Sequence, residues 1–305
     1  MSTTDVAAEG AVAAAPSQSS DPTRQVPTRR ISFDEALATL PKHFAADGDL
    51  ILSHLAAGLS AVFPDGEDFF VDAVRNYRGQ ITDPVLKRQV NGFIGQEAMH
   101  GRVHRAFNDR LAELGYPTKA VERRARFGLR QQRRFASHER QLAMTAALEH
   151  FTATLAELLL RDERARDLFG HPAAQQIFLW HALEENEHKS VAFDVYKAIG
   201  GSEKLRVQEM KITRFLFVAD TAFQVATSVL RDRDAYRRGA LRASVRRFKA
   251  SPLWDKALWA QLKDYDRADF HPEDSDTTAL LAEWRDRLFG DDGELAGNLV
   301  TAPAA

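Results

Sequence analysis

Two Glu-x-x-His motifs constrain the fold of this chain more than any other feature of its sequence. They run from Glu97 to His100 and from Glu185 to His188. On an α-helix, residues three apart lie on one face in adjacent turns, so each Glu and His pair points in the same direction. Two such motifs, with one Glu from each of two further helices, form the ligand set that four-helix bundles use for two iron or manganese ions. The sequence therefore predicts an all-α protein organised around a dinuclear metal site.

The two further glutamates stand at matching distances from the motifs. Glu67 lies 30 residues before Glu97, and their midpoint, residue 82, falls in a short Gly-, Asp- and Pro-containing turn. An antiparallel helix pair folded at this turn places both glutamates level, about 22 Å from the turn. Glu149 and Glu185 are 36 residues apart, and their midpoint, residue 167, falls in a second connection. Because the construction works twice, we expect the four carboxylates to converge.

The amino-acid composition limits the kinds of partner and metal site that the chain can have. The 305-residue chain has a net charge of -2, which predicts no chain-wide attraction to nucleic acid or to an anionic membrane. Cysteine is absent, which excludes disulfides, thiolate metal sites and cysteine nucleophiles. A transition metal must then be held by His and carboxylate, and of iron, manganese and zinc we favour iron. No basic segment followed by an apolar core marks a signal peptide, so we expect a cytoplasmic protein.

Helical spacing of apolar residues predicts one large domain with a tail at each end. We expect residues 1–28 to be a disordered tail, 29–290 a single all-α metal-binding domain, and 291–305 a frayed end. The bundle core covers about 50–200, and additional C-terminal helices cover about 203–289. The favoured architecture is a ferritin-like four-helix bundle, in which the basic stretch 116–137 provides the long crossover.

Three segments leave alternatives open. Pro64 either interrupts or kinks the first long helix. For the arginines of 116–137, a solvated face is favoured over a patch that binds an acidic partner. The helix 203–231 contains the apolar run Phe215–Ala219, and packing on the bundle is favoured over contact with a membrane surface.

The candidate ligands have charged or imidazole side chains on apolar helix faces, where burial is costly without a partner. The six favoured ligands are Glu67, Glu97, His100, Glu149, Glu185 and His188. His181 shares the face of Glu185 and is either a third histidine ligand or a packing residue. His104 is expected to support the ligands or line the pocket, and Glu184 to orient an imidazole on a neighbouring helix. Glu187 is expected at the surface, and His150 in a structural role.

Longer motifs around these residues resemble the bacterial family labelled "predicted metal-dependent hydrolase", over roughly residues 28–290. The motifs are Phe63-Pro64-x-Gly66-Glu67-x-Phe69-Phe70, Gln96-Glu97-x-x-His100-x-x-x-His104, Ala147-Leu148-Glu149-His150-Phe151, Trp180-His181-x-x-Glu184-Glu185-x-Glu187-His188-Lys189-x-Val191-Ala192-Phe193-Asp194-Val195-Tyr196 and Phe270-His271-Pro272. The ligand order also resembles that of the diiron arylamine N-oxygenases. Those proteins have Asp before each Glu-x-x-His, where this chain has Gln96 and Glu184, so the substrate class is not carried over.

Three functions fit these observations. The favoured one is a diiron enzyme that activates O2 to oxidise a small-molecule substrate. It would need an external electron donor, because the chain has no flavin or nucleotide motif. The first alternative is a hydrolase, in which two metal ions share a hydroxide that attacks an ester, amide or phosphate. The second is metal binding or storage. The oligomeric state stays open.

Overall fold

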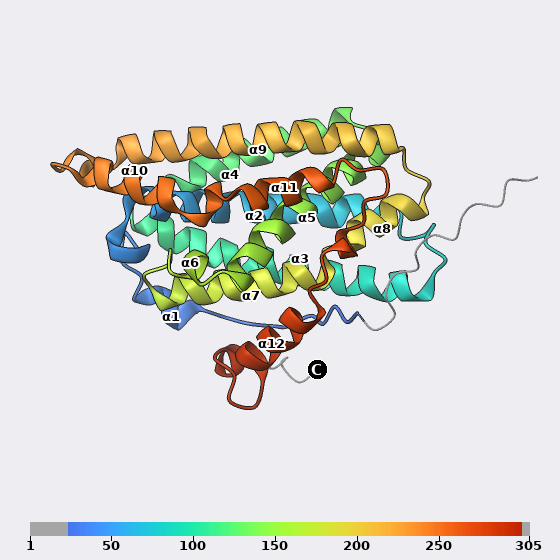
Figure 1. Cartoon of the computed structure of the whole chain (residues 1–305), viewed down its shortest axis with the longest axis horizontal. Helices are drawn as coiled ribbons and strands as arrows, with labels where there is room; N and C mark the ends of the chain where they lie inside the picture. Colours follow the sequence, from blue (N-terminus) through green and yellow to red (C-terminus); the bar gives the residue numbers. More distant parts are fainter. Residues whose placement is uncertain (1–23, 301–305) are drawn as a thin grey trace, which may run out of the picture.

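The computed structural model describes residues 24–300, and these residues fold as an all-α protein, as the sequence predicts. The described part contains no strand, only two isolated bridges, Ile31 with Leu299 and Ala45 with Phe169. Residues 1–23 and 301–305, which include most of the expected N-terminal tail and the last third of the expected C-terminal one, lie outside the described residues. The helices form an elongated molecule in which most long axes run in one direction (Figure 1).

Four long helices build the predicted core, with α2 packed along α3 and α5 along α7. They are α2 (Leu50–Arg75), α3 (Pro84–Glu113), α5 (His138–Arg161) and α7 (Pro172–His188). The helices α2, α3 and α5 each begin with a side-chain cap. Asp49, Asp83 and Ser137 each accept a hydrogen bond from a backbone amide of the first turn. The expected fourth helix is divided in two by a turn at residues 189–190, after which α8 (Val191–Ala198) follows.

Pro64 lies inside α2 without ending it. Proline has no amide hydrogen, so the carbonyl of Ser60, four residues earlier, loses its partner within the helix. The side-chain nitrogen of Asn108 on α3 donates to this carbonyl at 3.1 Å instead. The neighbouring helix thus supplies the hydrogen bond that the proline removes, which is why α2 can continue.

The predicted crossover is itself a helix, α4 (Thr118–Phe135), that packs on α2. Two of its arginines form ion pairs with α2, Arg126 with Asp65 and Arg133 with Asp72, both at 2.9 Å. Further helices follow the bundle, and α9 lies over α2 and α5. They are α9 (Glu203–Arg231), α10 (Ala240–Ala250), α11 (Lys256–Asp264) and α12 (Thr278–Phe289).

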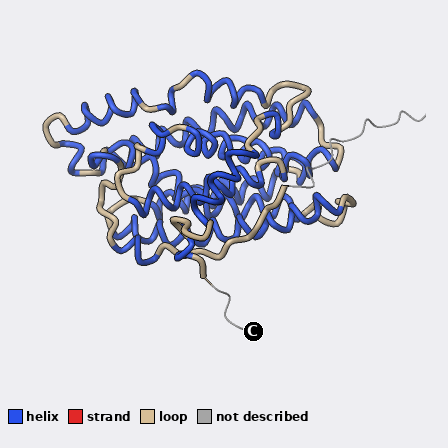
Figure 2. Tube along the Cα trace, turned by 60° about the horizontal axis from the view of Figure 1, so that its bottom comes forward, coloured by secondary structure: helices blue, strands red, loops and turns tan. Residues whose placement is uncertain are grey.

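Short helices fill the connections between these elements (Figure 2). They are α1 (Asp34–Ala38), α6 (Glu163–Arg166) and the 3-10 helices Ala46–Gly48, Arg233–Tyr236, Pro252–Trp254, Pro272–Asp274 and Ala296–Asn298. Among the described residues, none of the helices combines the length and the apolar character that crossing a bilayer needs.

Both ends of the described chain lie against the bundle, including parts of the stretches expected as tails. A Cβ atom added to Gly92 or Gly95 of α3 would collide with Val26 or Thr28, so these glycines let the N-terminal segment approach the helix closely. Near the other end, the side chain of Asn298 donates to the carbonyl of Ser32 at 2.9 Å. Such contacts join residues far apart in sequence and leave no compositional pattern.

Two apolar clusters occupy the two halves of the bundle and leave a polar layer between them. Along α3, Val90 and Phe93 belong to one cluster, whereas Val103 and Phe107 belong to the other. Glu97 and His100 fall between these pairs and are fully buried. The charged motifs are therefore placed at the centre of the bundle, where water cannot solvate them.

Candidate metal centre

The two Glu-x-x-His motifs meet in the polar layer, as their spacing predicts. The Nε2 atom of His188 lies 3.1 Å from Glu97 Oε1, 3.3 Å from Glu149 Oε2 and 3.5 Å from Glu185 Oε1. His100 faces the same group from the other side, with Nδ1 3.6 Å from Glu185 Oε1 and 3.9 Å from Glu97 Oε1. Three helices, α3, α5 and α7, therefore contribute to one buried cluster.

Glu67 and His181 complete this arrangement. His181 Nε2 lies 2.9 Å from Glu185 Oε1 and 3.9 Å from Glu67 Oε1, and its ring stacks on His100 with 4.1 Å between centroids. The structure thus brings together all seven candidate ligands. Their donor atoms form three overlapping groups, each within 4.8 Å: Glu67, His100 and His181; Glu97, His100 and Glu185; Glu97, Glu149 and His188.

Many polar atoms of this cluster are buried without a hydrogen-bond partner. Among the described residues, both carboxylate oxygens of Glu67, Glu97 and Glu149 lack one, as do the inward-facing nitrogens of His100 and His188. Leaving such groups unpaired costs about 1–3 kcal/mol each, and more for charged groups. A bound cation would satisfy many of them at once, so the donor set fits a metal centre.

Electrostatics of the metal-free cluster agree with this fit. Burial, reinforced by neighbouring carboxylates, raises the pKa of Glu67 and of Glu97 well above the ordinary value. Burial and the charge of Glu185 raise the pKa of Glu149 to about 7, although His188 opposes this. Burial alone would lower the pKa of His188, but the carboxylates of Glu149 and Glu185 raise it to about 10. Without a metal, a proton on His188 therefore supplies part of the missing positive charge.

The residue before each motif orients the histidine of the other motif. Gln96 Nε2 donates to two acceptors, Glu187 Oε2 at 2.7 Å and the carbonyl of Pro27 at 3.0 Å. This fixes the amide so that Gln96 Oε1 accepts from His188 Nδ1 at 2.9 Å. In the neutral imidazole, the lone pair of Nε2 then points at the carboxylates.

Glu184 does the same for His100, as expected from its place beside Glu185. His100 Nε2 donates to Glu184 Oε2 at 3.1 Å, which leaves the lone pair of Nδ1 facing the cluster. Burial raises the pKa of Glu184 to about 8, although the nearby guanidinium of Arg29 lowers it. Hydrogen bonds therefore join the two Glu-x-x-His motifs in both directions. The neutral amide of Gln96 holds His188, and the carboxyl group of Glu184 holds His100.

The prediction that Glu187 is a surface charge is wrong. Its side chain is fully buried and is held by the guanidinium groups of Arg29 at 2.7 Å and Arg285 at 2.6 Å. Helical spacing alone misassigned it, because the N-terminal segment and α12 cover a face of α7 that the four-helix core leaves open. Arg29, Arg285 and Gln96 are the supporting residues that the sequence did not reveal.

A second chain of hydrogen bonds orients His181. The hydroxyl of Ser60 donates to Asn108 Oδ1 at 2.7 Å, so it accepts from His104 Nδ1 at 2.8 Å. His104 Nε2 must then accept from His181 Nδ1, which lies 2.7 Å away. The lone pair of His181 Nε2 consequently faces Glu185, and a proton or a cation is needed between these two atoms. His104 lies behind His181, where it supports that ring.

A cavity of about 800 Å³ reaches the cluster at Glu67, His181 and Glu185. It lies between α2, α4, α5 and α9, and most of its wall is apolar. The apolar side chains include Val62, Phe63, Phe70, Leu129, Met144, Leu148, Ile212, Leu216 and Phe217. Its volume suits a small organic ligand, whose apolar body would pack here while one end approached the cluster.

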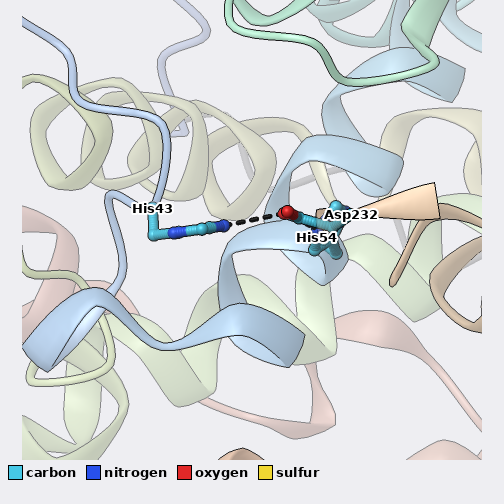
Figure 3. A group of neighbouring side chains, drawn as sticks. All are labelled: His43, His54 and Asp232. Carbon is cyan, nitrogen blue, oxygen red and sulfur yellow. Dashed lines mark hydrogen bonds and ion pairs between the residues drawn. The ribbon is translucent and has the colours of Figure 1, made fainter. Parts of the chain in front are cut away.

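A second histidine–carboxylate group, His43, His54 and Asp232, lies away from this centre (Figure 3). His43 Nε2 and His54 Nε2 are 2.8 and 3.0 Å from Asp232 Oδ2, and Lys42 Nζ lies 2.6 Å from Oδ1. In contrast to the main cluster, none of these ionisable atoms is buried without a hydrogen-bond partner. The ammonium group already neutralises the carboxylate, so this group joins the start of the bundle to the end of α9.

His150 has the structural role expected of it. Its ring lies beside Tyr265, and its Nε2 donates to the backbone carbonyl of Gln261 at 3.1 Å. This contact ties α5 to α11 and turns the imidazole away from the carboxylates.

An all-α bundle with a buried Glu/His cluster at its centre and an apolar cavity beside it defines a helical protein with a candidate metal-dependent active site. The chain belongs to the family described as "Predicted metal-dependent hydrolase", which matches residues 27–276. This span contains every residue of the cluster and confirms the resemblance seen in the motifs. Neither a curated protein nor a solved structure matches the chain significantly.

Proposed function

We propose that the cluster holds two iron ions and that the protein is an O2-activating enzyme with a diiron-carboxylate site. Glu67, His100 and His181 would hold one ion, and Glu149 and His188 the other. Glu97 and Glu185 would complete the ligand set, because Glu97 is common to two of the donor groups and Glu185 Oε1 lies 3.6 Å from His100 Nδ1 and 3.5 Å from His188 Nε2. The observation that carries the proposal is the set of four buried carboxylates with three imidazoles whose lone pairs face them.

Each part of the protein has a role in this function. An iron pair bound here would supply redox electrons and open coordination positions for O2. The four glutamates supply negative charge that offsets the charge of the ions, and Gln96, Glu184 and His104 hold the three imidazoles in the metal-binding tautomer. The two apolar clusters keep water from the site. The cavity at Glu67 would position a small-molecule substrate, and an external donor would provide electrons.

A two-metal hydrolase is the second candidate, and the family description favours it. Here the ions would be zinc or manganese, and they would supply an activated hydroxide without a change of oxidation state. Glu67 lines the cavity, so a substrate bound there would lie beside the metal ligands. The ligand set alone serves both reactions, so an experiment must separate them.

The test begins with metal analysis of the purified protein, for which we expect about two irons per chain. The reduced protein, prepared without oxygen, should then consume O2 rapidly when the two are mixed. Glu97→Gln and Glu185→Gln should abolish this reaction, whereas Glu157→Gln, a buried glutamate outside the cluster, should retain it. Hydrolysis of esters or phosphates by zinc- or manganese-loaded protein, with reduced iron protein inert to O2, would overturn the oxygenase proposal in favour of the hydrolase.

A further inference from the structure

Helix α9 exposes a row of large apolar side chains. Phe215, Leu216, Val218, Phe223 and Leu230 have between 42% and 71% of their surface in contact with solvent. Spacings of three, four and seven residues place Phe215, Phe223 and Leu230 on one face of the helix, together with exposed alanines at 219, 222 and 226. Asp220 is the only charged residue from 215 to 230, and it is paired with Arg124 of α4 at 2.9 Å. Contiguous apolar surface of this kind marks an interaction site.

The helices on either side of this row are strongly basic. Helix α4 contains seven Lys or Arg residues and one acidic residue, and α10 contains four Lys or Arg residues and none that is acidic. Part of this charge is already neutralised, because Lys119, Arg124, Arg126 and Arg133 of α4 and Arg247 of α10 form ion pairs with acidic residues. On α4, Arg123, Phe127, Arg130 and Arg134 are all exposed at helical spacing on one face. These three arginines carry positive charge directed outward beside the apolar row.

The basic helices border α9 directly. Arg124 of α4 stacks over the ring of Phe223, with 5.2 Å to its centroid. On the other side, α10 and α11 close a second cavity of about 520 Å³ against α9, lined almost entirely by apolar residues. Phe217 and Thr221 line both this cavity and the one that reaches the candidate metal centre. Figure 1 shows α9 along the upper edge of the molecule, and the solvent exposure of the row places it on the outer side of this helix.

We propose that the outer face of α9, with the exposed arginines of α4 and α10 (the α9 face), docks on the surface of an anionic lipid bilayer. The apolar row would enter the boundary between headgroups and acyl chains, and the arginines on its flanks would contact anionic headgroups. The pattern of an apolar stripe bordered by cations is the one that binds helices parallel to a membrane. An apolar ligand dissolved in the bilayer could then reach either cavity beside α9 without crossing water.

Charge distinguishes this partner from a second copy of the chain. In a two-fold dimer, each copy contributes the same surface patch to the interface. The basic flanks of one α9 face would therefore meet the basic flanks of the other. Like charges across such an interface are unfavourable. Anionic headgroups instead offer the opposite charge over a wide plane, which matches an apolar row with cations on both sides.

The test is sedimentation of the full-length protein with vesicles. One vesicle set contains phosphatidylcholine alone and the other includes about 30% phosphatidylglycerol, and we expect at least about tenfold stronger binding to the anionic set. High salt should weaken this binding, since the contacts with headgroups are electrostatic. Light scattering of the protein without lipid, measured in parallel, should show no association through the α9 face.

Two variants assign the binding to the α9 face. The double substitution Phe215→Ser with Phe223→Ser removes apolar contacts at exposed positions, and Arg130→Gln with Arg134→Gln removes cations at exposed positions. Each should lower binding to anionic vesicles about tenfold or more without changing the melting temperature. The matched control is Lys87→Gln with Arg88→Gln, two exposed cations on α3 away from α9, and it should bind as the unaltered protein does.

Three results would overturn the proposal. The first is equal binding to neutral and anionic vesicles, or no binding to either. The second is an effect of the α3 control as large as that of the α9 variants. The third is a dimer in light scattering that Phe215→Ser with Phe223→Ser makes monomeric, which would assign the α9 face to a second copy of the chain.

Discussion

Removing the charge of Glu149 should make the metal-free protein more stable. In the folded metal-free protein, burial and the charge of Glu185 raise the pKa of Glu149 from 4.5 to about 7. As the pH rises, the unfolded chain therefore releases this proton first, and the folded state loses stability between pH 4.5 and 7. At about 1.4 kcal/mol for each tenfold change in the ionisation constant, the full penalty above pH 7 is about 3 kcal/mol.

Glu149→Gln should abolish this penalty. We expect the metal-free variant to unfold about 5–10 °C above the unaltered protein at pH 8, and to differ by less than about 3 °C at pH 5. Addition of metal should reverse the order at pH 8, because the variant lacks one of the carboxylates that face the ion. The assay is thermal unfolding by circular dichroism, with chelator and then with the metal found in the purified protein.

Glu157→Gln is the matched control, since Glu157 is a buried glutamate on the same helix. Its carboxylate accepts hydrogen bonds from Arg161, Gln261 and Ser275, and these contacts lower its pKa although burial opposes them. The control should therefore lose stability at pH 8 and keep the full gain on metal addition. The reasoning fails if Glu149→Gln destabilises the metal-free protein at pH 8 as much as the control does.

Three further outcomes test the surroundings of the centre. Gln96→Leu removes the acceptor that orients His188 and should weaken metal binding about 10–100-fold, measured by competition with a chelator. Asp232→Asn should lower the free energy of unfolding by about 1–3 kcal/mol at pH 7 in urea titrations. Burial would raise the pKa of Asp232, but hydrogen bonds from Lys42 and its neighbours lower it, so the difference should shrink as the pH falls below about 4. Gly95→Ala should displace the N-terminal segment and lower the melting temperature, whereas Gly128→Ala, in open space within α4, should not.

Local patterns were sufficient to predict the core of the centre. Glu67 and Glu97 are brought together because they stand equally far from the short turn between two antiparallel helices, and that geometry follows from residue spacing alone. Within each Glu-x-x-His motif, Glu and His share a face because residues three apart lie on adjacent turns of a helix. The all-α class and the bounds of α9 were predicted from the helical spacing of apolar residues. The more specific ferritin-like relationship and the assignment of the ligands remain predictions.

Contacts between segments far apart in sequence could not be predicted from these local patterns. Arg29 reaches Glu184 across 155 positions of sequence, and no periodicity connects an N-terminal arginine with a helix in the middle of the chain. For the same reason Glu187 was placed at the surface: the segments that cover its side chain, α12 and the N-terminal stretch, are distant in sequence from α7. The glycines at 92 and 95 that admit this segment carry no signal by themselves, because glycine within a helix has several causes.

Pro64 illustrates how a local defect can serve the centre. The carbonyl that it leaves free, on Ser60, accepts from the amide of Asn108, and this fixes the oxygen of Asn108 toward the hydroxyl of Ser60. That hydroxyl can then only accept from His104, which in turn must accept from His181. In each of these hydrogen bonds only one assignment of donor and acceptor is possible. The missing amide hydrogen of a proline in α2 therefore determines which nitrogen of His181 faces the carboxylates. A residue that sequence rules treat as a helix breaker thus acts through three polar side chains to orient an imidazole at the candidate metal centre.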